Sequence, residues 1–128
     1  MTGNPALKDP LEVARLLIEI DDLAPALRAR LSAAFARQAL EEHLLERYGI
    51  LDRRIPRRPL LAFARTHEPD FGARASTAWL HLTWATHQRT DEVDPDLHTI
   101  RAILKEIVSL LATPPAPTGP TAAVTDEH

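Results

Sequence analysis

The feature that most constrains this chain is a run of apolar residues at helical spacing between Pro25 and Gly49. No Gly or Pro interrupts the run, whose members are Leu27, Leu31, Phe35, Ala39, Leu40, Leu44, Leu45 and Tyr48. Steps of three and four residues are typical of one helix face, and Gly49 suits a C-terminal cap. We therefore predict a helix of roughly 35 Å, at about 1.5 Å per residue, as the backbone of a bundle.

Two further helices are predicted from an Asp followed by Pro, a pairing that suits a helix start. Asp9-Pro10 opens an apolar stripe that we expect to end near Asp22. Asp94-Pro95-Asp96 opens the most regular stripe, whose members are Leu97, Ile100, Leu104, Ile107 and Leu111. The width of this last stripe predicts a helix that could serve both an intramolecular core and a dimer seam.

The middle of the chain alternates breaks and helices. Pro56 excludes a regular helix through the connector 50–58, and a short helix is predicted from Pro59. The stretch 68–72 breaks the pattern again, and a central helix should then run from about Ala73 to Thr86. We expect the segment 113–128, which is rich in Pro and small residues, to be a disordered tail.

Composition supports a single all-α domain. The 128 residues include only four Gly and 5% aromatic residues, which favours helices packed through Leu, Ile and Ala. We predict a bundle of four to five helices over residues 1–112. The absence of Cys excludes disulfides, thiolate metal sites and Cys nucleophiles. The sequence shows neither a signal-peptide pattern nor a membrane-length apolar run, so a cytoplasmic protein with no membrane partner is expected.

Positive charge is concentrated in the middle of the chain. Residues 49–74 hold six Arg against three acidic residues, a net charge of +3, although the whole chain carries −3. The densest cluster could bind an anion such as RNA, since guanidinium forks match phosphate oxygens; it consists of Arg53, Arg54, Arg57 and Arg58. Alternatively, these side chains pair with acids of a neighbouring helix, for which Glu41, Glu42 and Glu46 are candidates.

Arg74 and His81 are the candidate catalytic pair. Seven residues turn a helix through about 700°, so the two side chains should share one face. In RNA cleavage by the ribose 2′-OH, the His would move a proton and the Arg would hold the phosphate. The alternative is a solvated Arg near the helix start and a His without a catalytic role.

The remaining aromatic and His residues of the central helix are assigned to structure. We predict that Trp79 and Trp84 pack in the core, because the helix is largely apolar all round. His87 lies about 240° around the helix from His81, so the two cannot chelate one metal as an i, i+4 pair would. A cationic His87 would instead meet the negative end of the helix dipole, and it remains an additional site candidate. No metal or other cofactor is expected.

The order of these elements resembles the HEPN superfamily (higher eukaryotes and prokaryotes nucleotide-binding). The resemblance spans residues 10–112: a long helix with Arg37-Gln38-Ala39-Leu40-Glu41, a Gly, a short helix, Leu80 to His87, a polar loop and a closing apolar helix. It implies a small helical bundle of a bacterial toxin–antitoxin or antiphage defence system. Many members are dimeric, metal-independent ribonucleases and others are non-catalytic.

The family's catalytic signature is an Arg followed after four to six residues by a His, usually with a polar residue beside the Arg. Arg74-ASTAWL-His81 has the widest spacing, but Ala75 stands at the polar position. His87 matches the family's His by position, yet no Arg precedes it at residues 80–82. The resemblance therefore implies either a catalytic pair in an unusual register or a degenerate member. Expected partners are a second copy, RNA or a cognate protein; the competing hypothesis is a non-enzymatic interaction module or a small-ligand sensor.

Overall fold

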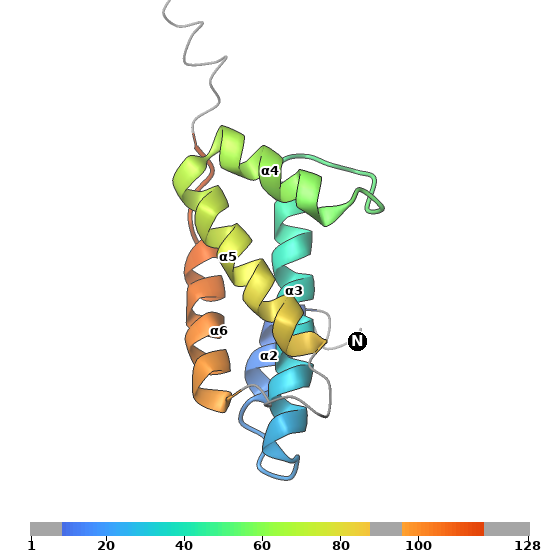
Figure 1. Ribbon diagram of the computed structural model, residues 1–128, viewed down its shortest axis with the longest axis vertical. Coiled ribbons are helices and arrows are strands. Elements are labelled where there is room, and N and C mark those ends of the chain that lie inside the picture. Colours follow the sequence, from blue (N-terminus) through green and yellow to red (C-terminus); the bar gives the residue numbers. More distant parts are fainter. Residues whose placement is uncertain (1–8, 88–95, 117–128) are drawn as a thin grey trace, which may run out of the picture.

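The chain folds into one bundle of α-helices. The computed structural model describes residues 9–87 and 96–116, and no strand occurs within them. Their five helices are α2 (Pro10–Leu17), α3 (Pro25–Arg47), α4 (Arg57–His67), α5 (Pro69–Thr86) and α6 (Leu97–Leu111). The predicted all-α bundle of four to five helices is confirmed. In Figure 1, α4 crosses one end of the bundle, whereas α3, α5 and α6 run along its length.

Helix α3 is the axis of the core, as predicted. It packs against α2, α5 and α6, and the small side chains of Ala29, Ala33 and Ala36, all fully buried, let these neighbours approach closely. Larger residues fill the space between the helices; those almost completely buried include Leu40, Leu44, Leu60, Leu82, Ile100, Ile107 and Leu110. Each such side chain contributes about 1.5–3 kcal/mol through burial, so this contact surface holds the bundle together.

Helix α2 is shorter than predicted, because it ends at Leu17 instead of near Asp22. Side chains of α3 satisfy backbone carbonyls at this end. Ser32 Oγ donates to Ala14 O at 2.8 Å, and Arg28 donates to Ile18 O at 2.7 Å. The Ile18 carbonyl thus has a buried partner without a further helical turn, and the chain is free to bend into α3.

The corner between α4 and α5 is tighter than predicted. α4 begins at Arg57 instead of Pro59, and α5 begins at Pro69 instead of Ala73, so Glu68 is the one residue between the two helices. The backbones meet at Gly72, where a Cβ would lie 2.6 Å from the carbonyl carbon of Ala64. Only Gly allows this approach, which explains why a residue read as a helix breaker lies inside α5.

Helix α5 is less buried than predicted. Its buried residues are Phe71, Gly72, Ala75, Ala78, Leu82 and Ala85, and the helices packed against α5 are α3, α4 and α6. Trp79 packs partly against the core, but Trp84 is 52% exposed, so its assignment to the core was wrong. The small residues of α5 fill the narrow space beside α3, and Trp84 points away from them.

Helix α6 occupies its predicted place, with Asp96 as the N-cap residue. Asp94 and Pro95 lie outside the described residues. After α6, residues 113–116 run beside the C-terminal end of α3, where Arg47 donates to Thr113 O at 2.8 Å. The disordered tail was predicted over 113–128, but its first four residues are held by hydrogen bonds to Arg47 and Glu68. The remainder, 117–128, falls outside the described residues. None of the described helices is both long and apolar enough to cross a bilayer.

Candidate functional site

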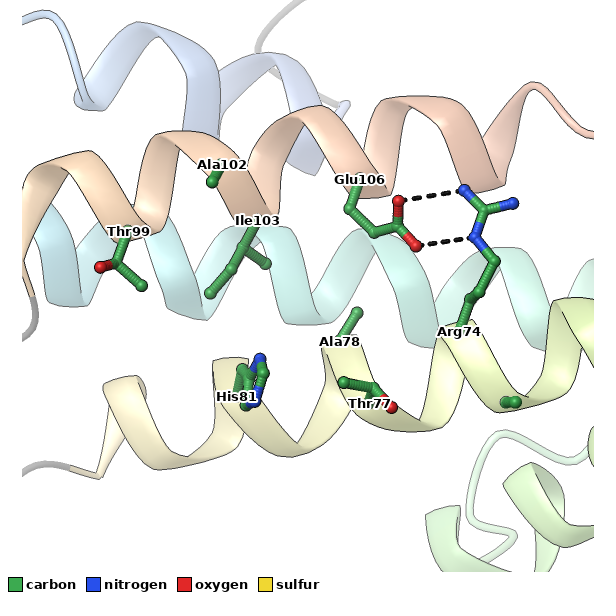
Figure 2. A pocket seen from close by; sticks show the side chains of 9 residues that line it. Arg74, Thr77, Ala78, His81, Thr99, Ala102, Ile103 and Glu106 are labelled. Carbon is green, nitrogen blue, oxygen red and sulfur yellow. Dashed lines mark hydrogen bonds and ion pairs between the residues drawn. The ribbon is translucent and has the colours of Figure 1, made fainter.

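A groove between α5 and α6 is the candidate site. It has a volume of about 530 Å³ and is drawn in Figure 2. Short side chains on both helices leave it open; its lining residues are Ala73, Arg74, Thr77, Ala78, His81, Thr99, Ala102, Ile103 and Glu106. Most of this surface is apolar, and its ionisable side chains are Arg74, Glu106 and His81. The spacing of Arg74 and His81 predicted one shared helix face, and the structure brings both side chains to the lining of this groove.

Arg74 is held by acid and hydroxyl partners on α6. Its Nε donates to Glu106 Oε2 at 2.8 Å, and its terminal nitrogen donates to Glu106 Oε1 at 3.0 Å and Ser109 Oγ at 3.1 Å. The hydrogen bond from Arg74 lowers the pKa of Glu106, and the same bond raises the pKa of Arg74. A phosphate at Arg74 would therefore have to displace a carboxylate that is already bound in bidentate geometry.

His81 lies two turns after Arg74 and opens to solvent. Its side chain lines the groove, as Figure 2 shows, and makes no hydrogen bond to any residue in 9–87 or 96–116. An accessible imidazole can both donate and accept a hydrogen bond. Within the described chain, however, no carboxylate or carbonyl fixes its tautomer, as a partner usually does for a catalytic His.

The arginine cluster lies outside the α5–α6 groove, and most of its side chains have carboxylate partners. Its loop projects on the side of α3 away from α6 (Figure 1), and none of the four side chains lines the α5–α6 groove. Three have carboxylate partners at 3.2 Å: Arg53 with Glu42, Arg54 with Asp52, and Arg57 with Glu41. The alternative of pairing with acids of the neighbouring helix thus describes Arg53 and Arg57, whereas Arg54 pairs within its own loop. Arg58 has no carboxylate partner in the described chain.

His87 is also separate from the groove. It is the C-cap residue of α5, and its Nε2 lies 3.2 Å from an Arg37 terminal nitrogen on α3. A guanidinium can only donate, so as a hydrogen bond this contact would run from Arg37 to His87 Nε2. The structure therefore does not bring His87 to Arg74 and His81.

Sequence reasoning missed the most densely bonded polar centre of the described chain. At the corner of α3, α4 and α5, the Arg47 side chain is 1% exposed and donates to both oxygens of Glu68, at 2.7 and 2.8 Å. Arg47 also stacks over the Phe71 ring at 3.7 Å and donates to the carbonyls of Thr113 and Pro114. No spacing along the chain signals these contacts, because their partners are 21 to 67 positions apart.

The bonds at this corner shift the acidity of its groups. Arg47, chiefly through its hydrogen bond, lowers the pKa of Glu68 to about 2, with help from the Tyr48 hydroxyl, which donates at 2.7 Å. Burial and the bond to Glu68 raise the pKa of Tyr48. Burial, followed by the charge of Arg47, lowers the pKa of His43. All four groups are committed to one another, which marks the corner as a structural network.

The comparisons assign no family. No protein-family model matches the chain, and neither curated proteins nor solved structures give a significant match. Within the described residues, no three His, Asp or Glu side chains come together in a way that could hold a metal ion. The fold therefore defines a small all-helical bundle with an accessible groove between α5 and α6.

Proposed function

We propose that the protein is a HEPN-like bundle of the bacterial defence or toxin–antitoxin type that acts as an interaction module. A second copy of the chain would occupy the α5–α6 groove and form a homodimer. The observation that carries this proposal is the open, mostly apolar groove beside a large exposed side chain, Trp84, which is 52% exposed.

The groove and the exposed side chain of Trp84 lie on neighbouring faces of α5. Trp84 follows Thr77 of the groove by seven residues, so the two lie within about 20° of each other around the helix. A surface that carries both a hollow and a protruding aromatic can match its own copy through a two-fold axis. Each Trp84 would then enter the partner's groove as a buried aromatic anchor, the residue type that dominates binding energy.

The charge at the end of the groove supports docking more than phosphate capture. Arg74 and Glu106 neutralise each other and are 42% and 38% exposed. They supply one cation and one anion to the rim, which a two-fold copy could bridge with its own pair. Binding of a phosphate would instead need Glu106 to leave.

Light scattering after size-exclusion chromatography tests the homodimer. We expect the unaltered chain to elute at twice its 14.2 kDa mass and Trp84→Ser or Ala102→Glu to elute as a monomer with unchanged helicity. Leu51→Ser is the matched control, since Leu51 is 94% exposed outside the groove. A monomeric unaltered chain at high concentration, or a dimer that survives both groove substitutions, would contradict the proposal.

Metal-independent cleavage of RNA is the second candidate, because Arg74 and His81 line one accessible groove. His81 would take the proton of a ribose 2′-OH while the 2′-oxygen attacks the adjacent phosphorus. The bond from phosphorus to the 5′-oxygen would break, and the leaving 5′-oxygen would take a proton from water. Arg74, released from Glu106, would stabilise the charge on the phosphate oxygens. A two-fold contact through the groove would bring both copies of the pair near one axis.

Incubation of the protein with single-stranded RNA and tRNA in the presence of EDTA tests this candidate. Cleavage should leave 2′,3′-cyclic phosphate ends, and both Arg74→Ala and His81→Ala should abolish it. His87→Ala is the control, because His87 is outside the groove. Activity that persists in Arg74→Ala and His81→Ala would remove the assignment, and the absence of cleavage would leave the interaction module as the function.

A further inference from the structure

Two arginines on the outer face of α4 differ from the arginines that lie near them in the sequence. Arg58 and Arg65 are seven residues apart and therefore lie on one face of the helix, both exposed. Neither has a carboxylate within ion-pair distance in residues 9–87 and 96–116, although the nearby Arg53, Arg54 and Arg57 all do. Helix α4 contains three Arg and no Asp or Glu. Its outer face is therefore positive without local compensation.

Both guanidinium groups border a small pocket between α4 and α5. The pocket has a volume of about 70 Å³, and its lining residues are Arg58, Leu61, Arg65, Ser76, Trp79 and Leu80. Arg65 donates to Ser76 Oγ at 2.7 Å. Because the hydroxyl accepts this bond, its own proton remains available to a ligand. The rim thus presents two cations and one hydroxyl donor, and the wall is apolar.

The nearest acid does not cancel this charge. Glu41 lies behind Trp79 and accepts the indole N–H at 2.8 Å. Its other oxygen is 3.2 Å from Arg57, and Arg37 is 3.7 Å away. The carboxylate is thus balanced by two cations of its own. It also fixes the Trp79 ring in place as part of the pocket wall.

We propose that the α4–α5 pocket binds a small phosphomonoester that carries an aromatic group. Two guanidinium groups match the two negative charges of a terminal phosphate, and their planar forks match its oxygens. A phosphodiester has only one negative charge, and a carboxylate has fewer acceptor oxygens than a phosphomonoester. Both would therefore form fewer favourable contacts with the two guanidinium groups. The aromatic group would lie on the half-exposed Leu80 and on Trp79, where stacking adds binding energy.

This pocket is distinct from the α5–α6 groove. Ser76 lines the pocket and Ala78 the groove, and two positions on a helix are about 200° apart. The two surfaces therefore lie on opposite flanks of α5. Ligand binding at α4 can be tested without regard to the fate of the dimer or the ribonuclease.

Fluorescence of Trp79 reports binding directly in a Trp84→Phe background, because the chain has two Trp residues. The probes are phenyl phosphate and AMP, with phenol, adenosine and methyl phenyl phosphate as matched compounds that lack the terminal dianion. We expect phenyl phosphate or AMP to bind more tightly than its matched compounds. Tighter binding of AMP would favour a nucleotide as the source of the phosphate, and tighter binding of phenyl phosphate would favour a smaller aryl ester.

Substitutions then localise the site. Arg58→Gln and Arg65→Gln should each raise the dissociation constant about ten-fold or more, the loss expected for one charge-assisted hydrogen bond. Arg54→Gln is the control, because Arg54 is 91% exposed on the preceding loop and does not line the pocket. Equal binding of phenol and phenyl phosphate, an unchanged constant in Arg58→Gln and Arg65→Gln, or an equal loss in Arg54→Gln would each overturn the proposal.

Discussion

Residues 9–87 and 96–116 contain two bidentate Arg–Glu pairs with nearly the same geometry and opposite surroundings. Arg47–Glu68 at the helical corner closes at 2.7 and 2.8 Å with side chains 1% and 11% exposed. Arg74–Glu106 in the groove closes at 2.8 and 3.0 Å, but its side chains are 42% and 38% exposed. Burial decides which pair is structural: water can replace a partner in the groove, whereas nothing can at the corner.

The largest expected effect comes from breaking the buried pair. Glu68→Ala should lower the free energy of unfolding by about 3–5 kcal/mol, because it leaves the Arg47 charge buried without a carboxylate. Urea unfolding followed by circular dichroism measures the change. Tyr48→Phe removes one donor to Glu68 and should cost about 1 kcal/mol, which keeps the test informative if Glu68→Ala does not fold. If Glu68→Ala were as stable as the unaltered chain, the buried Arg47–Glu68 pair would contribute no more to stability than the exposed Arg74–Glu106 pair.

The backbone of the same corner should tolerate little added volume. Gly72→Ala places a methyl group against the backbone of Ala64 and Arg65. We expect a loss of about 1–3 kcal/mol from overpacking, since backbone atoms cannot move aside as a flexible side chain would. Ser76→Ala, one turn further along α5 at a half-buried position, is the control for thermal unfolding. An equal effect at both positions would mean that the corner is not tightly packed.

Low pH should destabilise the bundle through protonation of Glu68 at the corner of α3, α4 and α5. The pKa of Glu68 falls from about 4.3 in an unfolded chain to about 2 in the bundle. A lowered pKa contributes stability that is complete above the unfolded value and is lost as pH falls toward the folded one. Stability should therefore decline between about pH 5 and pH 2, and the decline should be shallower in Glu68→Gln. Identical pH profiles for the two proteins would exclude Glu68 as the cause.

The smallest expected effect is at the exposed pair. Glu106→Gln should leave the urea midpoint close to that of the unaltered chain, because both partners are accessible to water and salt. The same substitution frees Arg74, so it should increase RNA cleavage if Arg74 is catalytic. A large loss of stability in Glu106→Gln would show that the two pairs play the same part in the fold.

The sequence predicted the helices whose evidence is local. α3 and α6 were identified because their apolar residues recur over many turns, and the burial of Leu40, Leu44 and Ile107 follows from that recurrence. The end of α2 and the start of α5 were missed because distant side chains or a close backbone approach determine them. Arg28 reaches Ile18 from the next helix, and Gly72 is placed by its contact with α4.

The candidate site likewise has features that follow from local sequence and features that depend on distant contacts. The spacing of Arg74 and His81 predicted one shared face, since both lie on one helix. The occupation of Arg74 by Glu106 was beyond the sequence, because 32 residues separate the two and no pattern joins them. Trp84 was misassigned for a related reason: hydrophobicity does not reveal which side of a helix its neighbours leave uncovered.

The contacts of residues 113–116 have a consequence for the order in which the bundle assembles. Arg47 reaches Thr113 and Pro114 across 66 and 67 positions, and Glu68 accepts from the Ala116 N–H across 48. Contacts of such separation form after local helices and their nearest pairings. We therefore expect the hydrogen bonds of residues 113–116 to form late in folding. Their loss should speed unfolding while the folding rate stays nearly the same. The segment after α6 thus governs how long the folded bundle lasts.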